Sequence, residues 1–154
     1  MRTAHHVMIK VFCKDGEDCE TIKDALVRLS SIDEEQDKVS VRQQTATGFE
    51  GKTIRILTVN LERQPHIRRF LEHLAGALNH GDRSKLVNQC ESRIDPNFHF
   101  FLRLDKQALL GEGKYQVVDH GDCFHVDIAL ACFPKKRENA LAAVKEIFQE
   151  MKEH

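Results

Sequence analysis

The residues best suited to chemistry lie in one short segment. A regular strand over residues 98–104 would place His99, Phe101 and Arg103 together, on the face opposite its apolar residues. An aromatic ring between a histidine and an arginine suits RNA, because the cation neutralises phosphate while the ring stacks on an unpaired base. Lys106 follows just beyond this strand and is a further candidate phosphate contact.

Other strands should add basic residues to the same face. Alternation predicts that Lys10, Arg42 and Arg55 join Arg103 there, with Asp127 as the opposing carboxylate. Four positive charges against one negative give this face +3, whereas the whole chain has a net charge of -1. An open sheet face must also be solvated, and long basic side chains do this well. RNA binding and simple solvation are therefore two open interpretations.

A second basic group, Lys135, Lys136 and Arg137, stands at the start of the last predicted helix. Cations at that end oppose the helix dipole, so their presence favours a phosphate partner at the exposed amides. Solubility alone is the alternative interpretation.

Metal and catalytic sites find little support. His120, Asp122 and His125 are close in sequence, but their spacing matches no zinc-hydrolase pattern. Cys123 shares a predicted strand face with His125 and Asp127, at about 7 Å per step, too far apart for a nucleophile and its base. The sequence contains no phosphate loop, dinucleotide fingerprint or nucleophile elbow. We expect no cofactor, no metal and no enzymatic activity.

The bulk composition is that of a globular domain. The 154 residues are 41% hydrophobic and 31% charged, and predict one domain over residues 1–154. No apolar run approaches the roughly 20 residues of a membrane helix, so we expect a cytoplasmic protein. The five cysteines are odd in number and never in CxxC spacing, which predicts reduced core residues rather than disulfides.

Periodicity and turn signals give the order of the elements. We predict hairpins for the second and third strands and for the last two strands, and a loop over about residues 31–38. Strands are expected over about residues 5–14, 39–45, 52–62, 98–104, 114–118 and 123–132, and helices over about 18–30, 65–79, 82–90, 106–111 and 136–152. Asp18 and Asp105 are expected to cap helices.

This order predicts an α+β fold. Hairpins make most neighbouring strands antiparallel, and the one-sided apolar stripes of the helices require one face of a sheet to pack on. We expect a two-layer sandwich with one mixed, mostly antiparallel sheet and helices packed on one face.

Several segments together resemble a known family. They are Glu91-Ser92-Arg93-Ile94-Asp95, the run from Phe100 to Ala108 with its Arg-Leu-Asp-Lys-Gln core, Thr47-Gly48-Phe49-Glu50-Gly51, and Tyr115 to Pro134. The chain resembles the archaeal family of predicted RNA-binding proteins, often labelled predicted exosome subunits. The resemblance implies a fold similar to the ribosomal protein that binds 5S ribosomal RNA, and RNA binding without catalysis. An association with the exosome or other RNA-processing proteins follows from the family label alone.

The leading hypothesis is a non-enzymatic RNA-binding protein that uses the open sheet face. The alternative is a protein interaction module, or a homodimer, in which the same face packs against another chain. The predicted RNA contacts are Arg103, Lys106, Phe101, His99, Arg55, Arg42, Lys10, Lys135, Lys136 and Arg137.

Overall fold

The computed structural model describes residues 3–149, and in these residues the strands form one six-stranded sheet in the order β2-β3-β1-β6-β4-β5. Every neighbouring pair is antiparallel. The strands are β1 (Ala4–Cys13), β2 (Arg42–Thr47), β3 (Thr53–Leu61), β4 (His99–Asp105), β5 (Val117–Val118) and β6 (Cys123–Leu130).

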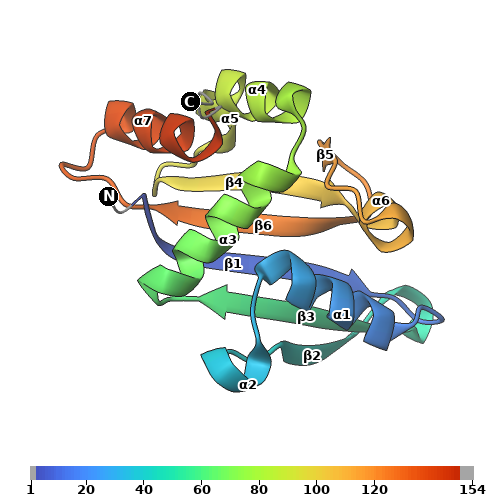
Figure 1. The fold of residues 1–154 in the computed structure, drawn as a ribbon. Helices are drawn as coiled ribbons and strands as arrows, with labels where there is room; N and C mark the ends of the chain where they lie inside the picture. The colour runs from blue at the N-terminus through green and yellow to red at the C-terminus, as the bar shows by residue number, and fades with distance from the viewer. Residues whose placement is uncertain (1–2, 150–154) are drawn as a thin grey trace.

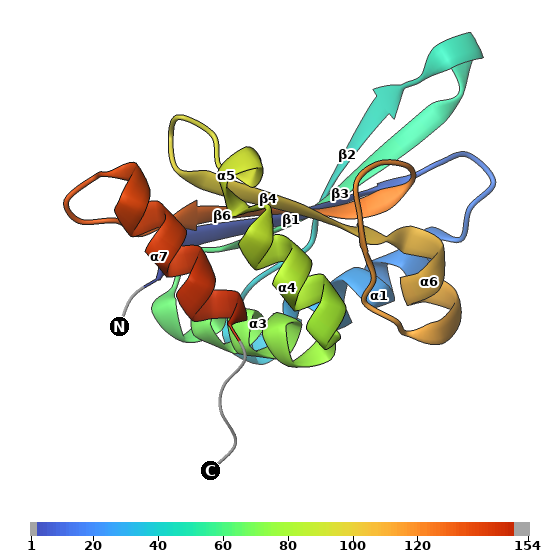
Figure 2. The same ribbon diagram turned by 90° about the horizontal axis from the view of Figure 1, so that it is seen from above.

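The helices lie mainly on one side of this sheet (Figures 1 and 2). In Figure 2, α1, α3, α4 and α7 are drawn below the sheet, whereas α5 lies next to β4. The predicted two-layer α+β architecture is therefore confirmed. The helical elements are α1 (Cys19–Ser30), α2 (Glu34–Asp37), η1 (Phe49–Gly51), α3 (Gln64–Ala77), α4 (His80–Asn88), α5 (Cys90–Arg93), α6 (Lys106–Glu112) and α7 (Arg137–Phe148).

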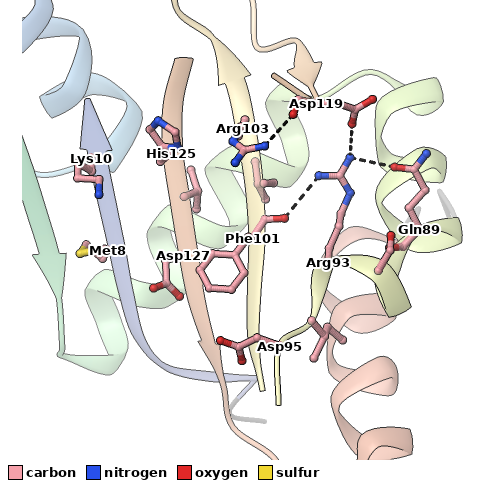
Figure 3. Close-up of a pocket in the computed structure, with 14 residues that line it drawn as sticks. Met8, Lys10, Gln89, Arg93, Asp95, Phe101, Arg103, Asp119, His125 and Asp127 are labelled. Atoms are coloured by element: carbon pink, nitrogen blue, oxygen red, sulfur yellow. Dashed lines mark hydrogen bonds and ion pairs between the residues drawn. The ribbon is translucent and has the colours of Figure 1, made fainter. Parts of the chain in front are cut away.

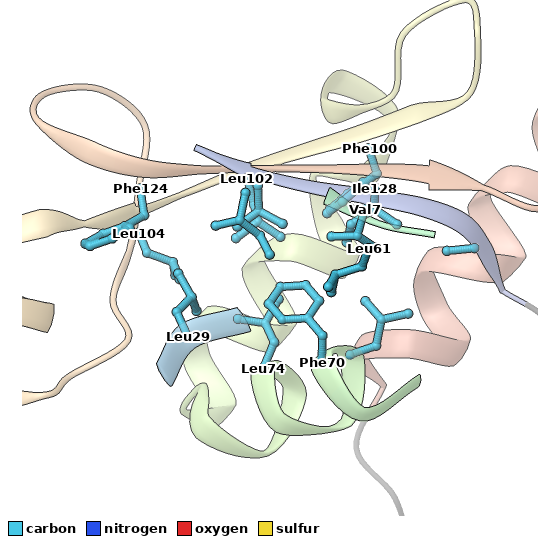
Figure 4. Close-up of a cluster of buried hydrophobic side chains, with 14 of the residues drawn as sticks. Val7, Leu29, Leu61, Phe70, Leu74, Phe100, Leu102, Leu104, Phe124 and Ile128 are labelled. Carbon is cyan, nitrogen blue, oxygen red and sulfur yellow. The ribbon is translucent and has the colours of Figure 1, made fainter. Parts of the chain in front are cut away.

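The hydrophobic core fills the space between the sheet and the helices (Figure 4). Phe100, Leu102 and Leu104 of β4 point into it, and Phe70 and Leu74 of α3 meet them from the helical layer. Their complete or nearly complete burial follows from the period of two in the strand and the apolar stripe of the helix. The apolar face predicted for residues 98–104 is thus the inner face of the sheet.

Two of the helix caps follow directly from the sequence. The Asp18 carboxylate accepts hydrogen bonds from the amides of Glu20 and Thr21, and α1 begins at the next residue. The Asp105 carboxylate accepts from the Ala108 amide at 2.9 Å, so β4 ends where α6 begins. Both caps satisfy first-turn amides that have no partner within the helix.

Some predicted elements are wrong in detail. Residues 31–38 are not a continuous loop, because the Asp33 side chain caps the short helix α2. Asn79, rather than Asp82, caps α4, since the Asn79 side chain accepts from the Asp82 amide and the helix runs through Gly81. The last predicted helix ends at Phe148, and its predicted residues 150–152 lie outside the described part of the chain.

The strand pairing at one edge also differs from the prediction. β5 does not form a hairpin with β6; it pairs with β4, and β6 lies between β4 and β1. The connection over residues 119–122 is therefore not a tight turn, because the chain crosses over β4 between the two strands. This crossing brings Asp119 to the rim of the sheet face that lacks the main helical layer.

Cys13 and Cys19 form a disulfide, which corrects the prediction of reduced cysteines. The turn between β1 and α1 brings their Cα atoms to 5.8 Å, within the range that a disulfide spans. Cys90, Cys123 and Cys132 are free thiols. Among the described residues, no helix has the length and apolar character needed to cross a membrane.

Candidate nucleic-acid interface

A row of polar side chains crosses the sheet on the face opposite the main helical layer. The strand register pairs Arg42 with Thr58, Thr58 with Lys10, Lys10 with His125, and His125 with Arg103. Residues directly paired in a sheet share a face, so these five side chains form one line across five strands. The row places three of the predicted RNA-binding cations, Arg42, Lys10 and Arg103, on one surface.

Phe101 lies beside this row and is 42% exposed, which is unusual for so large an apolar side chain. Its ring packs nearly parallel to that of His99, with the centroids 6.1 Å apart and the planes at 22°. His99 in turn is held by Asp127, whose carboxylate lies 2.6 Å from the imidazole Nδ1. The predicted pair His99 and Phe101 thus forms a positioned aromatic platform on the open face.

A hollow of ≈ 540 Å³ surrounds Phe101 (Figure 3). Its floor is formed by β1, β6 and β4, and residues around α5 and the segment before β6 form its wall. The lining residues are Met8, Lys10, Gln89, Ser92, Arg93, Ile94, Asp95, Phe101, Leu102, Arg103, Asp119, His125, Val126 and Asp127.

Arg93 is a member of this site that was not among the predicted contacts. Its guanidinium donates to the Gln89 side chain at 2.9 Å, to the Asp119 carboxylate at 3.0 Å and to the Phe101 carbonyl at 3.5 Å. These bonds tie α5 to the edge of β4 and to the segment before β6. The sequence contained one indication that Arg93 belongs to the site, because Arg93 lies in the Glu-Ser-Arg segment that resembles the family. Its position near Phe101, however, depends on tertiary packing.

Asp119 was also absent from the predicted contacts, and its carboxylate neutralises positive charge at the same end of the hollow. Its carboxylate lies 3.3 Å from the Lys85 ammonium and 3.0 Å from Arg93. The hydrogen bond and charge of Lys85, followed by the charge of Arg93, lower the pKa of Asp119. Its backbone carbonyl accepts a hydrogen bond from Arg103 at 2.7 Å, so one residue positions two arginines.

Lys106 does not belong to this surface. The prediction that it contacts phosphate is wrong, because a ligand in solution cannot reach its side chain. The side chain is fully buried. Its ammonium donates to the Phe12 carbonyl and to Glu17, each at 2.8 Å, and lies 3.2 Å from Asp122. The chain turns from strand to helix at Asp105, which directs Lys106 into the structure instead of along the open face.

Arg55 was also assigned to the wrong face. It pairs with Cys13 of β1, whose side chain belongs to the buried phase, whereas Ile56 pairs with Phe12 on the open face. Arg55 is nevertheless exposed, and it lies near the start of β3. Three cations against Asp127 therefore give the predicted face +2 instead of +3.

The second basic group lies at a different place, around the start of α7. Lys135, Lys136 and Arg137 are all exposed, and the neighbouring Phe133 is 97% exposed. Lys136 occupies the N-cap position without a side-chain hydrogen bond to the helix, while Arg137 donates to the Glu91 carbonyl at 2.5 Å. These three cations and the ring of Phe133 are thus exposed neighbours in sequence, in a segment separate from the row on the sheet.

Cys123 and His125 are closer than the strand spacing predicted, with 3.7 Å between Sγ and Nε2. Burial raises the pKa of the Cys123 thiol, and burial together with Arg103 and Lys10 lowers the pKa of His125. Both shifts favour the neutral forms at neutral pH, the opposite of a thiolate paired with an imidazolium. Asp127 is bonded to His99 and does not orient His125. In the described residues, no group of three or more His, Cys, Asp or Glu side chains is arranged to hold a metal ion.

The geometry defines a class of protein: an α+β sheet with an open face that presents a row of cations beside an exposed aromatic platform. Residues 6–130 match the model of a family described as RNA binding. This match covers most of the chain and includes the whole cation row. The chain therefore belongs to this RNA-binding family.

Individual relatives agree with that assignment. The chain is 34% identical to the RNA-binding protein PAB1135 of Pyrococcus abyssi over 144 residues, which cover 93% of this chain and 92% of the relative. Among solved structures, Mth689 of Methanothermobacter thermautotrophicus, a DUF54 protein, is 28% identical, with a TM-score of 0.77 and coverage of 96% and 99% of the two chains. SSO0741 of Sulfolobus solfataricus shares the fold, with a TM-score of 0.73 at 20% identity and coverage of 93% and 96%.

Proposed function

We propose that the protein binds single-stranded RNA without catalysing a reaction on it, and that the open sheet face is the contact surface. The observation that carries the proposal is the cross-strand row of Arg42, Lys10 and Arg103 beside the exposed ring of Phe101. Membership of an RNA-binding family supports the ligand class. The face of the sheet supplies the two groups that unpaired RNA needs, cations for phosphate and an aromatic surface for a base.

In this proposal the three cations contact successive phosphates. Each is separated from the next by one intervening strand, so their Cα atoms lie roughly 10 Å apart across the sheet. Arg103 is pre-oriented by its hydrogen bond to the Asp119 carbonyl, and Lys10 lies 5.6 Å from the centre of the Phe12 ring. Ordering these side chains before binding reduces the entropy lost when phosphate arrives.

Phe101 and His99 supply the stacking surface. Stacking tolerates any base and is worth about 1 to 3 kcal/mol per base. The Asp127 contact holds His99 in place, so the two rings offer a base an ordered platform.

Lys135, Lys136 and Arg137 extend the proposed surface as a second phosphate contact. Phe133 beside them adds an exposed ring that can stack on a further base. The extension is independent of the sheet face, so removal of the three charges should weaken binding only to RNA long enough to reach both regions.

A salt titration of the full chain tests the proposal. Three phosphate contacts predict that the logarithm of the association constant for a single-stranded RNA falls with a slope of about -2 against the logarithm of salt concentration. Filter binding at several salt concentrations measures this slope. No binding even at low salt would overturn the proposal. A strict dimer in a sedimentation measurement would instead favour the alternative in which the open face packs against another chain.

The resemblance also predicts association with the exosome or other RNA-processing proteins. This partner stays a prediction, separate from RNA binding itself. Affinity purification of the tagged protein from its native cells, with nuclease added to remove RNA bridges, should retain exosome subunits if the contact is direct.

A further inference from the structure

The hollow around Phe101 has a feature that phosphate binding does not explain. Its lining contains three cations, Lys10, Arg93 and Arg103, and also three carboxylates, Asp95, Asp119 and Asp127. A site for phosphate alone should have an excess of positive charge. Because cations and carboxylates are equal in number here, we infer that part of the hollow accepts hydrogen bonds from its ligand instead of donating them to an anion.

The charges are also separated in space. Figure 3 shows Arg103, Asp119 and Arg93 toward one end of the hollow, with Asp119 paired to Arg93, while Asp127 and Asp95 flank the Phe101 ring. A phosphate beside the ring would meet these two carboxylates and be repelled. A base stacked on the ring would instead direct its N–H donors at them.

Asp127 is the better placed of the two carboxylates. Asp95 Oδ1 already accepts from the amides of Asn97 and His99, each at 2.9 Å, and so shapes the turn before β4. Asp127 is paired directly with Phe101 across β6 and β4, and only its Oδ1 contacts His99. A carboxylate has about four acceptor positions, so Asp127 retains acceptors at both oxygens. Its side chain is 19% exposed and can be reached from the hollow.

We propose that the hollow binds one unpaired guanine of the RNA, stacked on Phe101, with the N1–H and the N2 amino group donating to the Asp127 carboxylate. Guanine is the base whose Watson–Crick edge presents two adjacent donors, which match the two oxygens of a carboxylate. Adenine and cytosine present one amino group beside an acceptor, and uracil presents one imide N–H. The phosphate of the same nucleotide then meets Arg103, which lies two residues from Phe101 along β4 and on the same face.

This inference rests on the proposed function, and it adds that RNA binding prefers sequences with an unpaired guanine. The hollow of ≈ 540 Å³ lies within the roughly 300–1,000 Å³ of pockets that hold small ligands, so a nucleotide fits. The bonds of Arg93 to Gln89, Asp119 and the Phe101 carbonyl fix the wall beside the ring. Such fixed walls favour recognition of one extruded base over general contact with a strand.

The test uses the full chain and short oligouridine RNAs that differ at a single central position. By fluorescence anisotropy, the RNA with one guanine should bind about 10-fold tighter than the RNAs with adenine, cytosine or uracil there. Inosine, which lacks the N2 amino group, should lose most of this preference. Because the inosine comparison uses the unaltered protein, it stays decisive even if a variant fails to fold.

Asp127→Asn is the matching variant, because an amide keeps the size and the contact with His99 but cannot accept at both positions. It should abolish the preference for guanine, measured as the ratio of this variant's affinities for the guanine RNA and for oligouridine. Asp24→Asn removes the same charge from the exposed side of α1 and should leave the preference intact. Salt-sensitive binding without preference for guanine, or equal weakening of all RNAs by Asp127→Asn, would overturn the guanine site alone. Absence of binding to every RNA would overturn the proposed function with it.

Discussion

Arg103 and Lys106 are three residues apart and have the same charge, yet the structure places them in opposite environments. Arg103 ends on the exposed sheet face, where its guanidinium bonds to a backbone carbonyl and leaves donors free. Lys106 is fully buried against Glu17, Asp122 and the Phe12 carbonyl. Arg103 therefore has N–H donors available for a ligand, whereas all three donors of Lys106 are used within the fold.

The difference shows that basic residues near one another in sequence need not form one site. A buried ammonium must be paired within the protein, since its desolvation is otherwise too costly. Lys106 therefore links β1, the turn before α1 and the segment before β6. An exposed guanidinium contributes little to stability and is free for function.

Replacement of Lys106 should produce the largest effect, and it should be on stability. Lys106→Ala removes a fully buried side chain and leaves the Phe12 carbonyl and Glu17 without the ammonium that donates to them, so the free energy of unfolding should fall by about 3 kcal/mol. Urea denaturation measures it. Arg103→Ala is the matched control and should change the free energy of unfolding by less than about 0.5 kcal/mol. Equal losses for the two variants would contradict the contrast.

Replacement of Phe101 should act on the ligand instead. Phe101→Ala removes the exposed ring of the platform and should weaken binding to single-stranded RNA by about 2 kcal/mol, since a stacked base is lost. Anisotropy titrations give the affinity, and urea denaturation should show little change because the ring is 42% exposed. Phe133→Ala makes the same substitution away from the sheet, and a short RNA should bind this variant normally. A larger loss for Phe133→Ala would move the main stacking site to the segment before α7.

A smaller effect is expected from the exposed arginines. Arg103→Gln should weaken binding by about 1 kcal/mol and make the salt slope shallower by about 0.7, because one phosphate contact is lost. Arg55→Gln should change neither quantity, since Arg55 belongs to the other phase of β3. Affinities measured at three salt concentrations separate the two variants. An equal change of slope in both would return Arg55 to the interface.

The pattern of the sequence was sufficient for the fold and for part of the site. Alternation in residues 98–104 correctly separated Phe100, Leu102 and Leu104 from Phe101 and Arg103, because burial of one sheet face imposes a period of two. The Asp18 and Asp105 caps are local interactions and could be identified from neighbouring residues. The assignment of RNA as ligand came from resemblance, and the family match supports it at the level of the family.

The errors arose where the answer depends on distant parts of the chain. The partners of Lys106, Glu17 and Asp122, are 89 and 16 residues away, and no local pattern brings them together. Arg55 lies in a strand with two apolar phases, and only the pairing with β1 shows that Leu57 rather than Ile56 faces the helices. β5 was paired with the wrong strand because a short segment followed by a turn predicts a hairpin even when the chain crosses over β4.

The smallest effect expected is a change in pH dependence at the centre of the open face. Burial, followed by Arg103 and Lys10, lowers the pKa of His125 below its ordinary value of 6.5, so the unfolded chain binds this proton more readily than the folded chain. The resulting stability is present above the ordinary pKa and is lost as pH falls through it toward the folded-state pKa. His125→Gln should therefore reduce the difference in unfolding free energy between about pH 7.5 and about pH 5.5. Burial also lowers the pKa of His73, so His73→Gln measures a second contribution from the helical side. An unchanged pH dependence in His125→Gln would contradict this prediction, because it would mean that neither burial nor the neighbouring cations lower the pKa of His125 in the folded chain.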